Sequence, residues 1–286
     1  MPWTERPLTA RLGIELSGLT ISAGLGEDDR KAIYDATARH GVALIRGQAL
    51  SDEAIYDLAT TIGDELVQIQ FLKDAPPHAR GVIPLRNIDA EGRLLPADDW
   101  NVQQNRANEL WHTDLSFQRP RATLSMLYSR IIPPAGGDTE FCDTRLLWET
   151  MSDDERTNLA GLNCTHWGFH SRRKFGFTDL PQEVLDRYPP IERPLVFEHL
   201  QSGRTALTIG GYVASVEGMD NARSEAFLDD LVARATVPEN VYVHRWQVGD
   251  LLLWDNRCMI HRATPWDLTA HARDMRGVRL FDAAHP

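Results

Sequence analysis

Apolar residues along the chain gather into short runs with the spacing of strands. The stretch 12–19 alternates apolar and polar residues, while 41–47, 122–128 and 249–256 are almost continuously apolar between glycines or polar residues. Alternation with a period of two predicts a half-buried strand, and a short apolar run predicts a buried one. Further strands are expected at 81–83, 241–246 and 275–281, a turn running into a strand at 131–141, and a hairpin of 193–197 with 206–209.

Helical spacing is confined to a few segments. Helices are expected over 28–40, 51–62, 146–159 and 224–235. Ser51 is a good N-cap for the second of these, and the pair Ser152 and Glu155 predicts a capping box within the third. Many short strands with glycine and proline turns, and helices at the start and in insertions, indicate a mostly β fold with flanking helices around a β-sandwich or jelly roll core.

Two long stretches depart from this pattern. Residues 68–108 carry four prolines, and residues 169–190 are rich in charged and aromatic side chains. Long irregular connections in a compact domain are often lids or binding loops, so both are interpreted as substrate-loop insertions. Since no repeat, glycine-serine linker or low-complexity tract divides the chain, residues 1–286 are predicted to form a single domain.

The composition of the chain argues against some classes of binding partner. The chain has 286 residues, 42% of them hydrophobic, and a formal net charge of −11. This acidic balance argues against nucleic acid or an anionic membrane as partner, although a few arginines in a pocket could still bind a small anion. Three widely spaced cysteines argue against a disulfide framework, and neither a signal peptide nor a transmembrane segment is evident. We therefore expect a soluble, cytoplasmic protein.

The clearest candidate chemistry lies at residues 110–117. In an extended strand His112 and Asp114 would point to the same face and present an imidazole beside a carboxylate. His261, at the end of an apolar run, would complete a set of two histidines and one carboxylate, which typically holds Fe(II) with open positions; zinc fits this set less well. Taken alone, each of these residues is more typical of a structural role than of a metal ligand.

Several motifs resemble a known family. His112-x-Asp114, His261 and Arg273, together with Leu110-Trp111-His112, Pro133-Pro134-x-Gly136-Gly137-Asp138-Thr139, Arg245-Trp246-x-Val248-Gly249-Asp250 and Trp254-Asp255-Asn256-Arg257, resemble the Fe(II)/2-oxoglutarate dioxygenases of the taurine and 2,4-dichlorophenoxyacetate dioxygenase family. They look closest to the 2,4-dichlorophenoxyacetate branch.

The resemblance implies a double-stranded β-helix, a cupin-like jelly roll, with the metal at the mouth of the barrel. His112, Asp114 and His261 would be the catalytic metal ligands for Fe(II). Arg273 and Thr139 would bind the far carboxylate of the co-substrate 2-oxoglutarate, and O₂ would be the oxidant. Because Asp114 is present, the resemblance implies hydroxylation and not halogenation.

The residues that would choose the substrate differ from those of the relatives. The position four residues after Arg273, an arginine in the taurine branch, is Gly277, and Tyr212 and Ser215 stand where the phenoxyacetate branch has histidines. A small anionic substrate is expected, with an aryloxyalkanoate or related aromatic carboxylate as first choice and ether cleavage to a phenol and an oxo acid as one outcome. The candidate substrate contacts are Lys73, Tyr212, Phe117, Arg276 and Arg279.

Other functions remain open from the sequence. An alkylsulfonate or alkylsulfate dioxygenase, or a biosynthetic hydroxylase, would keep the same core residues and change only the loops. A non-enzymatic jelly roll binding module would need none of the triad geometry. The resemblance also suggests a homo-oligomer.

Overall fold

The computed structural model describes residues 3–63, 65–66, 81–99, 102–103, 106–176 and 182–281. Within them the largest unit is an eight-stranded mixed sheet. Its strands, in spatial order, are β1 (Thr4–Pro7), β2 (Ile14–Ser17), β3 (Val42–Ile45), β14 (Leu251–Asp255), β6 (Leu124–Ile131), β16 (Asp274–Phe281) and β4 (Glu65–Leu66), with β5 (Ile83–Arg86) also paired to β16.

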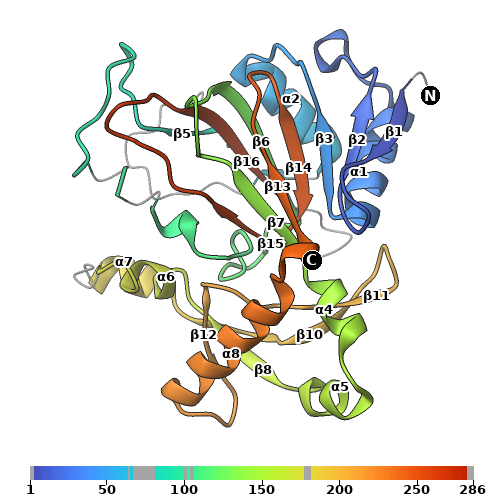
Figure 1. The fold of residues 1–286 in the computed structure, drawn as a ribbon, viewed down its shortest axis with the longest axis vertical. Helices are drawn as coiled ribbons and strands as arrows, with labels where there is room; N and C mark the ends of the chain where they lie inside the picture. The colour runs from blue at the N-terminus through green and yellow to red at the C-terminus, as the bar shows by residue number, and fades with distance from the viewer. Residues whose placement is uncertain are drawn as a thin grey trace.

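The large sheet is covered on both faces, which explains its continuous apolar runs. Leu251 and Leu253 of β14 belong to a core shared with helices α1 (Glu27–His40) and α2 (Asp52–Ile62), which lie along one face (Figure 1). Leu252 and Trp254 point to the opposite face, into a second core. We call this second side the inner face.

A smaller sheet completes the inner core. It consists of β13 (Val241–His244), β7 (Thr139–Asp143) and β15 (Met259–Ala263), with β7 in the middle and all pairs antiparallel. Phe141 and Met259 of this sheet share a core with Leu252 and Trp254 of the large sheet. The chain passes from β14 to β15 through a turn at residues 256–258, so the two sheets are joined close to the inner core.

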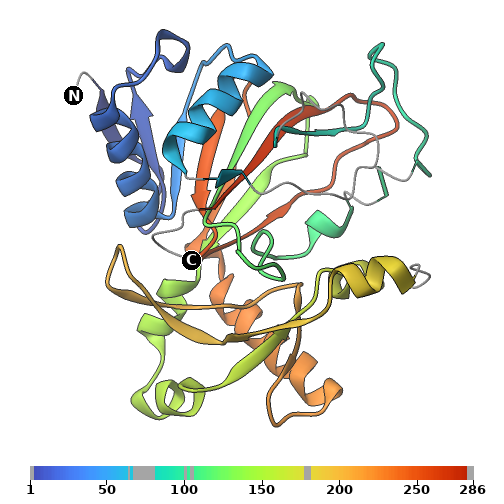
Figure 2. The same cartoon turned by 180° about the vertical axis from the view of Figure 1, so that it is seen from behind.

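A third group of elements lies at one end of the molecule, the lower end in Figures 1 and 2. It contains the sheet β12 (Val213–Val216), β8 (Asn163–His166) and β9 (Ile191–Pro194), the hairpin β10 (Val196–His199) and β11 (Arg204–Leu207), and the helices α4 (Thr144–Thr150), α5 (Asp153–Leu159), α6 (His170–Arg173), α7 (Gln182–Arg187) and α8 (Asn221–Ala235). Leu228 and Leu231 of α8 pack there against Val213, Val216 and Cys164. Short 3₁₀ helices occur at Ile21–Ala23, Arg106–Glu109 and Pro238–Asn240.

The expected sheet-rich fold with few helices is confirmed, but some local predictions were wrong. The helix predicted over 146–159 is two helices, α4 and α5, because Ser152 caps α5 and forms the predicted capping box with Glu155. Residues 110–117 do not form a strand: apart from one isolated bridge at His112, residues 110–113 are irregular and 114–117 form a turn, in which Leu115 has a φ of 51°. Strands β8 and β12, and helices α6 and α7 within 169–190, were not predicted. No helix among the described residues is long and apolar enough to cross a membrane.

Candidate metal centre

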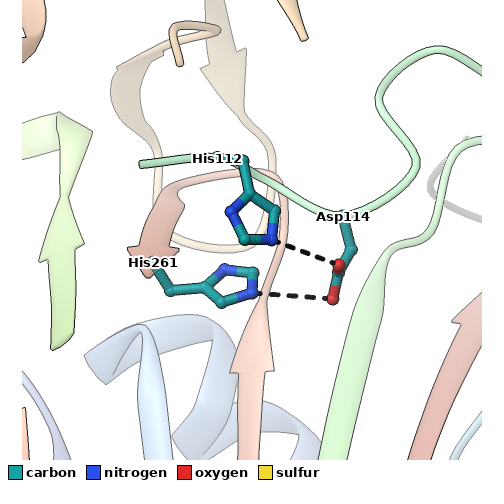
Figure 3. Close-up of side chains that lie close together, drawn as sticks. All are labelled: His112, Asp114 and His261. Atoms are coloured by element: carbon teal, nitrogen blue, oxygen red, sulfur yellow. Dashed lines mark ion pairs between the residues drawn. The ribbon is translucent and has the colours of Figure 1, made fainter. Parts of the chain in front are cut away.

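Three buried side chains, two from one segment and one from a distant part of the sequence, converge beside the inner core. His112 Nε2 lies 3.8 Å from Asp114 Oδ1, and His261 Nε2 lies 3.8 Å from Asp114 Oδ2 (Figure 3). One ligand atom from each of the three residues lies within 4.8 Å of the others. The structure therefore brings together the two histidines and the carboxylate that the sequence singled out.

Backbone contacts fix this convergence. His112 and His261 exchange two backbone hydrogen bonds, with N–O distances of 2.9 and 2.8 Å, so the segment before Asp114 is paired with the middle of β15. On the other side Gly211 N donates to Trp111 O at 2.7 Å. Gly210, with a φ of 112°, approaches so closely that a Cβ there would lie 2.7 Å from the same carbonyl oxygen. The segment 111–112 is thus held between two backbone neighbours.

The two imidazoles are oriented in different ways. His112 Nδ1 lies 2.7 Å from Leu110 O, a contact that assigns the proton to Nδ1 and leaves the Nε2 lone pair directed toward Asp114. His261 is held by packing, with its ring centroid 5.8 Å from that of Phe141 and 4.7 Å from that of Trp254. Burial lowers the pKa of both histidines, so both are neutral and available as nitrogen ligands at neutral pH.

Asp114 is held by polar contacts from three directions. Ser125 Oγ donates to its Oδ2 at 2.7 Å, Arg279 Nε lies 2.7 Å from Oδ2, and Asn256 Oδ1 accepts from its backbone N–H at 3.2 Å. Burial by itself would raise the pKa of Asp114, but the charges of Arg279, His261 and His112 outweigh it and lower that pKa to about 2. The carboxylate is therefore ionised at neutral pH.

The side chains that hold Asp114 come from three adjacent strands of the large sheet. In the strand register Arg279 of β16 lies opposite Ser125 of β6, and Ser125 lies opposite Trp254 of β14. Asn256, just after β14, donates from Nδ2 to Ser125 Oγ at 2.8 Å and accepts from Trp254 Nε1 at 3.1 Å. Side chains from three neighbouring strands, aligned in one row across the inner face, thus position the Asp114 carboxylate.

This donor set fits a divalent metal. Two neutral imidazole nitrogens and one carboxylate form the arrangement that typically binds Fe(II) on one face and leaves other positions open. A second buried group, His199, Asp255 and Cys258, also comes together among the described residues. There Arg257 and His199 already pair with Asp255, and burial raises the pKa of the Cys258 thiol well above its ordinary value, so this group is a structural network.

Arg273 and Thr139, expected near the co-substrate, both lie buried at the inner face. Arg273 Nε has no hydrogen-bond partner among the described residues, and its guanidinium lies 5.1 Å from the ring centroid of Trp266. Burial lowers the pKa of Arg273 to about 10, so it remains charged at neutral pH. Thr139 Oγ1 accepts from Trp246 Nε1 at 3.0 Å, which leaves the hydroxyl proton of Thr139 free to be donated.

Arg273 also borders a pocket. The lining residues are Leu85, Arg86, Asn87, Val102, Arg106, Asn108, Glu109, Ala263, Trp266, Leu268 and Arg273. Part of this lining comes from the segment 68–108, whose interpretation as a substrate loop stays a prediction.

Four of the predicted substrate residues can be placed. Tyr212 lies beside the metal ligands, with its ring centroid 5.6 Å from that of His112 and 4.7 Å from that of Phe117. Arg279 contacts Asp114, whereas Arg276 points to the opposite face of β16 and pairs with Asp52 of α2. Arg276 is therefore removed from the substrate candidates, because alternate residues of a strand face opposite sides. Lys73 lies outside the described residues.

Sequence reasoning missed several side chains at this centre. Ser125 was the detectable one, because a single polar residue at a buried position of an apolar strand needs a partner. Asn256 belonged to a motif that had been noted only for its resemblance. Arg172 of α6 hydrogen-bonds the Tyr212 hydroxyl and its charge reaches His112. No sequence signal distinguished Arg172 from the surrounding surface charges.

Comparison with known proteins agrees with this geometry. The profile of the family described as "Taurine catabolism dioxygenase TauD, TfdA family" matches residues 4–279. The chain is 35% identical to the alpha-ketoglutarate-dependent 2,4-dichlorophenoxyacetate dioxygenase of Cupriavidus pinatubonensis, covering 99% of both chains. It is 30% identical to the alpha-ketoglutarate-dependent sulfate ester dioxygenase of Pseudomonas putida, covering 96% of this chain and 88% of that one.

A solved structure supports the same assignment. AAD-2, determined in complex with Mn(II) and N-oxalylglycine, superposes with a TM-score of 0.90 at 29% identity, covering 99% of this chain and 98% of that one. The match to the family extends over nearly the whole chain, and the His-Asp-His cluster lies within it. The chain therefore belongs to the taurine catabolism dioxygenase TauD, TfdA family, and it is a 2-oxoglutarate-dependent non-haem iron dioxygenase that uses Fe(II), 2-oxoglutarate and O₂.

Proposed function

We propose that this enzyme hydroxylates a small aromatic carboxylate, most specifically an aryloxyalkanoate, at the carbon between the ether oxygen and the carboxylate. The observation that carries the proposal is the setting of the His112, Asp114 and His261 cluster, which lies beside the aromatic rings of Phe117 and Tyr212 and the cation of Arg279. The similarity to 2,4-dichlorophenoxyacetate dioxygenases over the whole chain supports the same substrate class.

We assign His112, Asp114 and His261 as the residues that hold Fe(II). Arg273 and Thr139 would bind the far carboxylate of 2-oxoglutarate. Arg273 is a buried cation with an unpartnered Nε, and the Thr139 hydroxyl has a proton to donate because its oxygen already accepts from Trp246. A buried guanidinium and a hydroxyl donor are the kinds of group that bind a carboxylate.

The two sheets that face each other across the inner core support a double-stranded β-helix as the fold core, and we propose that the chain acts as one domain around it. The bound Fe(II) with 2-oxoglutarate supplies the oxidising chemistry, in which O₂ and 2-oxoglutarate yield succinate and CO₂ while one oxygen atom becomes a substrate hydroxyl. At the ether carbon that hydroxylation gives a hemiacetal, which breaks down to a phenol and an oxo acid.

The protein's own part is to position the substrate and exclude water. Leu115, Phe117, Ala122 and Tyr212 form a small buried apolar cluster next to the metal ligands. An aromatic ring packed there would be shielded from water, and ring–ring contacts with Phe117 and Tyr212 would orient it. Burial raises the pKa of Tyr212, opposed by Arg172, so its hydroxyl stays protonated at neutral pH.

The test is aerobic incubation with Fe(II), 2-oxoglutarate and a panel of aryloxyalkanoates, with succinate and phenol measured together. We expect equimolar succinate and phenol from the wild type and neither product above background from His112→Ala. Equal succinate output from the two proteins with every substrate would contradict the proposed chemistry.

A second candidate substrate is a sulfate ester, because the chain is also 30% identical to a sulfate ester dioxygenase. Hydroxylation at the carbon that bears the sulfate would release sulfate and an aldehyde. Alkyl sulfates belong in the same panel, with sulfate release as the readout, and the substrate with the higher kcat/KM decides between the two classes.

A further inference from the structure

Arg279 has one edge of its guanidinium committed and another edge free. Nε lies 2.7 Å from Asp114 Oδ2, and Nη2 donates to Asp114 Oδ1 at 3.3 Å. The Nε contact is an ion pair without hydrogen-bond geometry, whereas Nη1 is buried and has neither a hydrogen-bond nor an ion-pair partner among the described residues. Since a guanidinium can bind two oxygen atoms along either edge, the Nη1 and Nη2 edge can still hold an anion.

Gly277 makes room for this arrangement. It lies two residues before Arg279 on the same face of β16, and a Cβ at position 277 would lie 2.7 Å from Arg279 Nη1. Any larger residue at this position would force the guanidinium away, so Gly277 and Arg279 act as a pair. In the taurine branch position 277 is an arginine. In this chain the space beside Gly277 is occupied by the guanidinium of Arg279, two residues further along the strand.

We propose that Arg279 is the residue that binds the substrate's anionic group, using its free edge while its other edge holds Asp114. This inference rests on the proposed function and specifies its substrate contact. Arg276 faces α2, and Arg273, just before β16, is assigned to 2-oxoglutarate. Of these three arginines, Arg279 is therefore the one beside the metal ligands.

The arrangement also sets which carbon reacts. An anion on the free edge of Arg279 shares its guanidinium with a metal-ligand carboxylate, so the substrate is anchored next to the metal. The carbon attached directly to the anionic group is then the one held nearest the oxidising centre. This favours substrates whose reactive C–H is adjacent to the carboxylate, as it is in an aryloxyacetate.

The test compares an anion with its neutral analogue. Dissociation constants of (2,4-dichlorophenoxy)acetate and (2,4-dichlorophenoxy)acetamide are measured by calorimetry without O₂, at saturating Fe(II) and 2-oxoglutarate for each variant. The ratio of the two constants cancels any effect that a substitution has on the metal site alone. We expect the wild type to prefer the anion, and Arg279→Gln to reduce this preference by about 10- to 100-fold, the loss expected for a charge-assisted pair.

Two further variants keep the test decisive if Arg279→Gln folds poorly. Gly277→Ala retains the arginine and should reduce the anion preference in the same direction, because the new methyl group displaces Nη1. Arg276→Gln, on the other face of the same strand, should retain the wild-type preference.

An unchanged preference in Arg279→Gln or Gly277→Ala, with the wild type preferring the anion, would overturn the role of Arg279 and leave the proposed function standing. A wild type that binds neither compound, or binds both equally, would overturn the inference together with the proposed substrate class.

Discussion

The centre has two sides that are built differently. On the metal side, Asp114 is held by Ser125, Arg279 and Asn256 from neighbouring strands of one sheet, through contacts between 2.7 and 3.2 Å. On the substrate side, Phe117 and Tyr212 belong to separate connecting segments and meet mainly through ring packing. Strand register fixes positions tightly, whereas loops vary with less effect on the fold. The metal ligand is thus anchored in the sheet, and the aromatic contacts expected with the substrate lie in the loops.

The largest expected effect is on the metal side. Asp114→Ala removes the only anionic donor of the three-residue metal cluster. We expect succinate formation to fall below ~1% of wild type, since even residues that only support a metal ligand typically cost 10- to 100-fold. Mn(II) binding, measured by calorimetry, should weaken in parallel. Normal metal affinity in this variant would show that Asp114 is not a ligand.

Ser125→Ala tests the support of that carboxylate. The substitution removes the 2.7 Å hydrogen bond to Asp114 Oδ2 and leaves Asn256 Nδ2 without its acceptor. Metal affinity is expected to fall by about 10- to 100-fold while the KM for substrate changes little. Ser129→Ala is the matched control, because Ser129 lies on the same strand and bonds Gln247 and Asp250 instead. Equal metal affinities in Ser125→Ala and Ser129→Ala would show that Ser125 does not position the Asp114 carboxylate for metal binding.

The third prediction concerns the support of the substrate side. His166 Nδ1 lies 2.9 Å from Ser116 Oγ, next to Phe117, and burial, followed by the charges of Arg193 and Arg121, lowers the pKa of His166 to about 3. The folded protein therefore keeps His166 neutral below pH 6.5, where the unfolded chain takes up the proton. This linkage lowers the free energy of unfolding by about 1.4 kcal/mol for each pH unit below 6.5, until pH ~3.

Urea unfolding between pH 7.5 and 5 measures this dependence. His166→Gln should lose the corresponding part of the slope. Parallel curves for the wild type and His166→Gln would rule out a buried neutral His166.

The smallest effect is expected from Tyr212→Phe. The ring packing against Phe117 is kept and only the hydrogen bond with Arg172 is lost. The KM for an aryloxyalkanoate should rise by about 3- to 10-fold, as expected for one hydrogen bond, with Mn(II) affinity unchanged. A change in metal affinity instead would mean that the two sides of the centre are not separate.

Much of the fold could be predicted because its signals are local. The buried strands β3 and β14 follow from short apolar runs, and the boundary between α4 and α5 is marked by the Ser152 and Glu155 capping box, although the break itself was missed. Residues 110–117 were predicted as a strand and are not one, because His112 obtains its backbone partner from His261, which is 149 residues away. Such a distant partner leaves no local signal.

By itself, the sequence determined the kinds of donor atom: two histidines, one aspartate and a later arginine whose combination resembles one family of dioxygenases. Only the tertiary structure decided which of the three arginines from 273 to 279 face the metal, since the pleat of β16 sends Arg276 to α2 and keeps Arg279 at Asp114. It also decided what Gly277 means. A missing side chain is visible in the sequence, but the group that occupies its space is set by strand register and packing across the inner face.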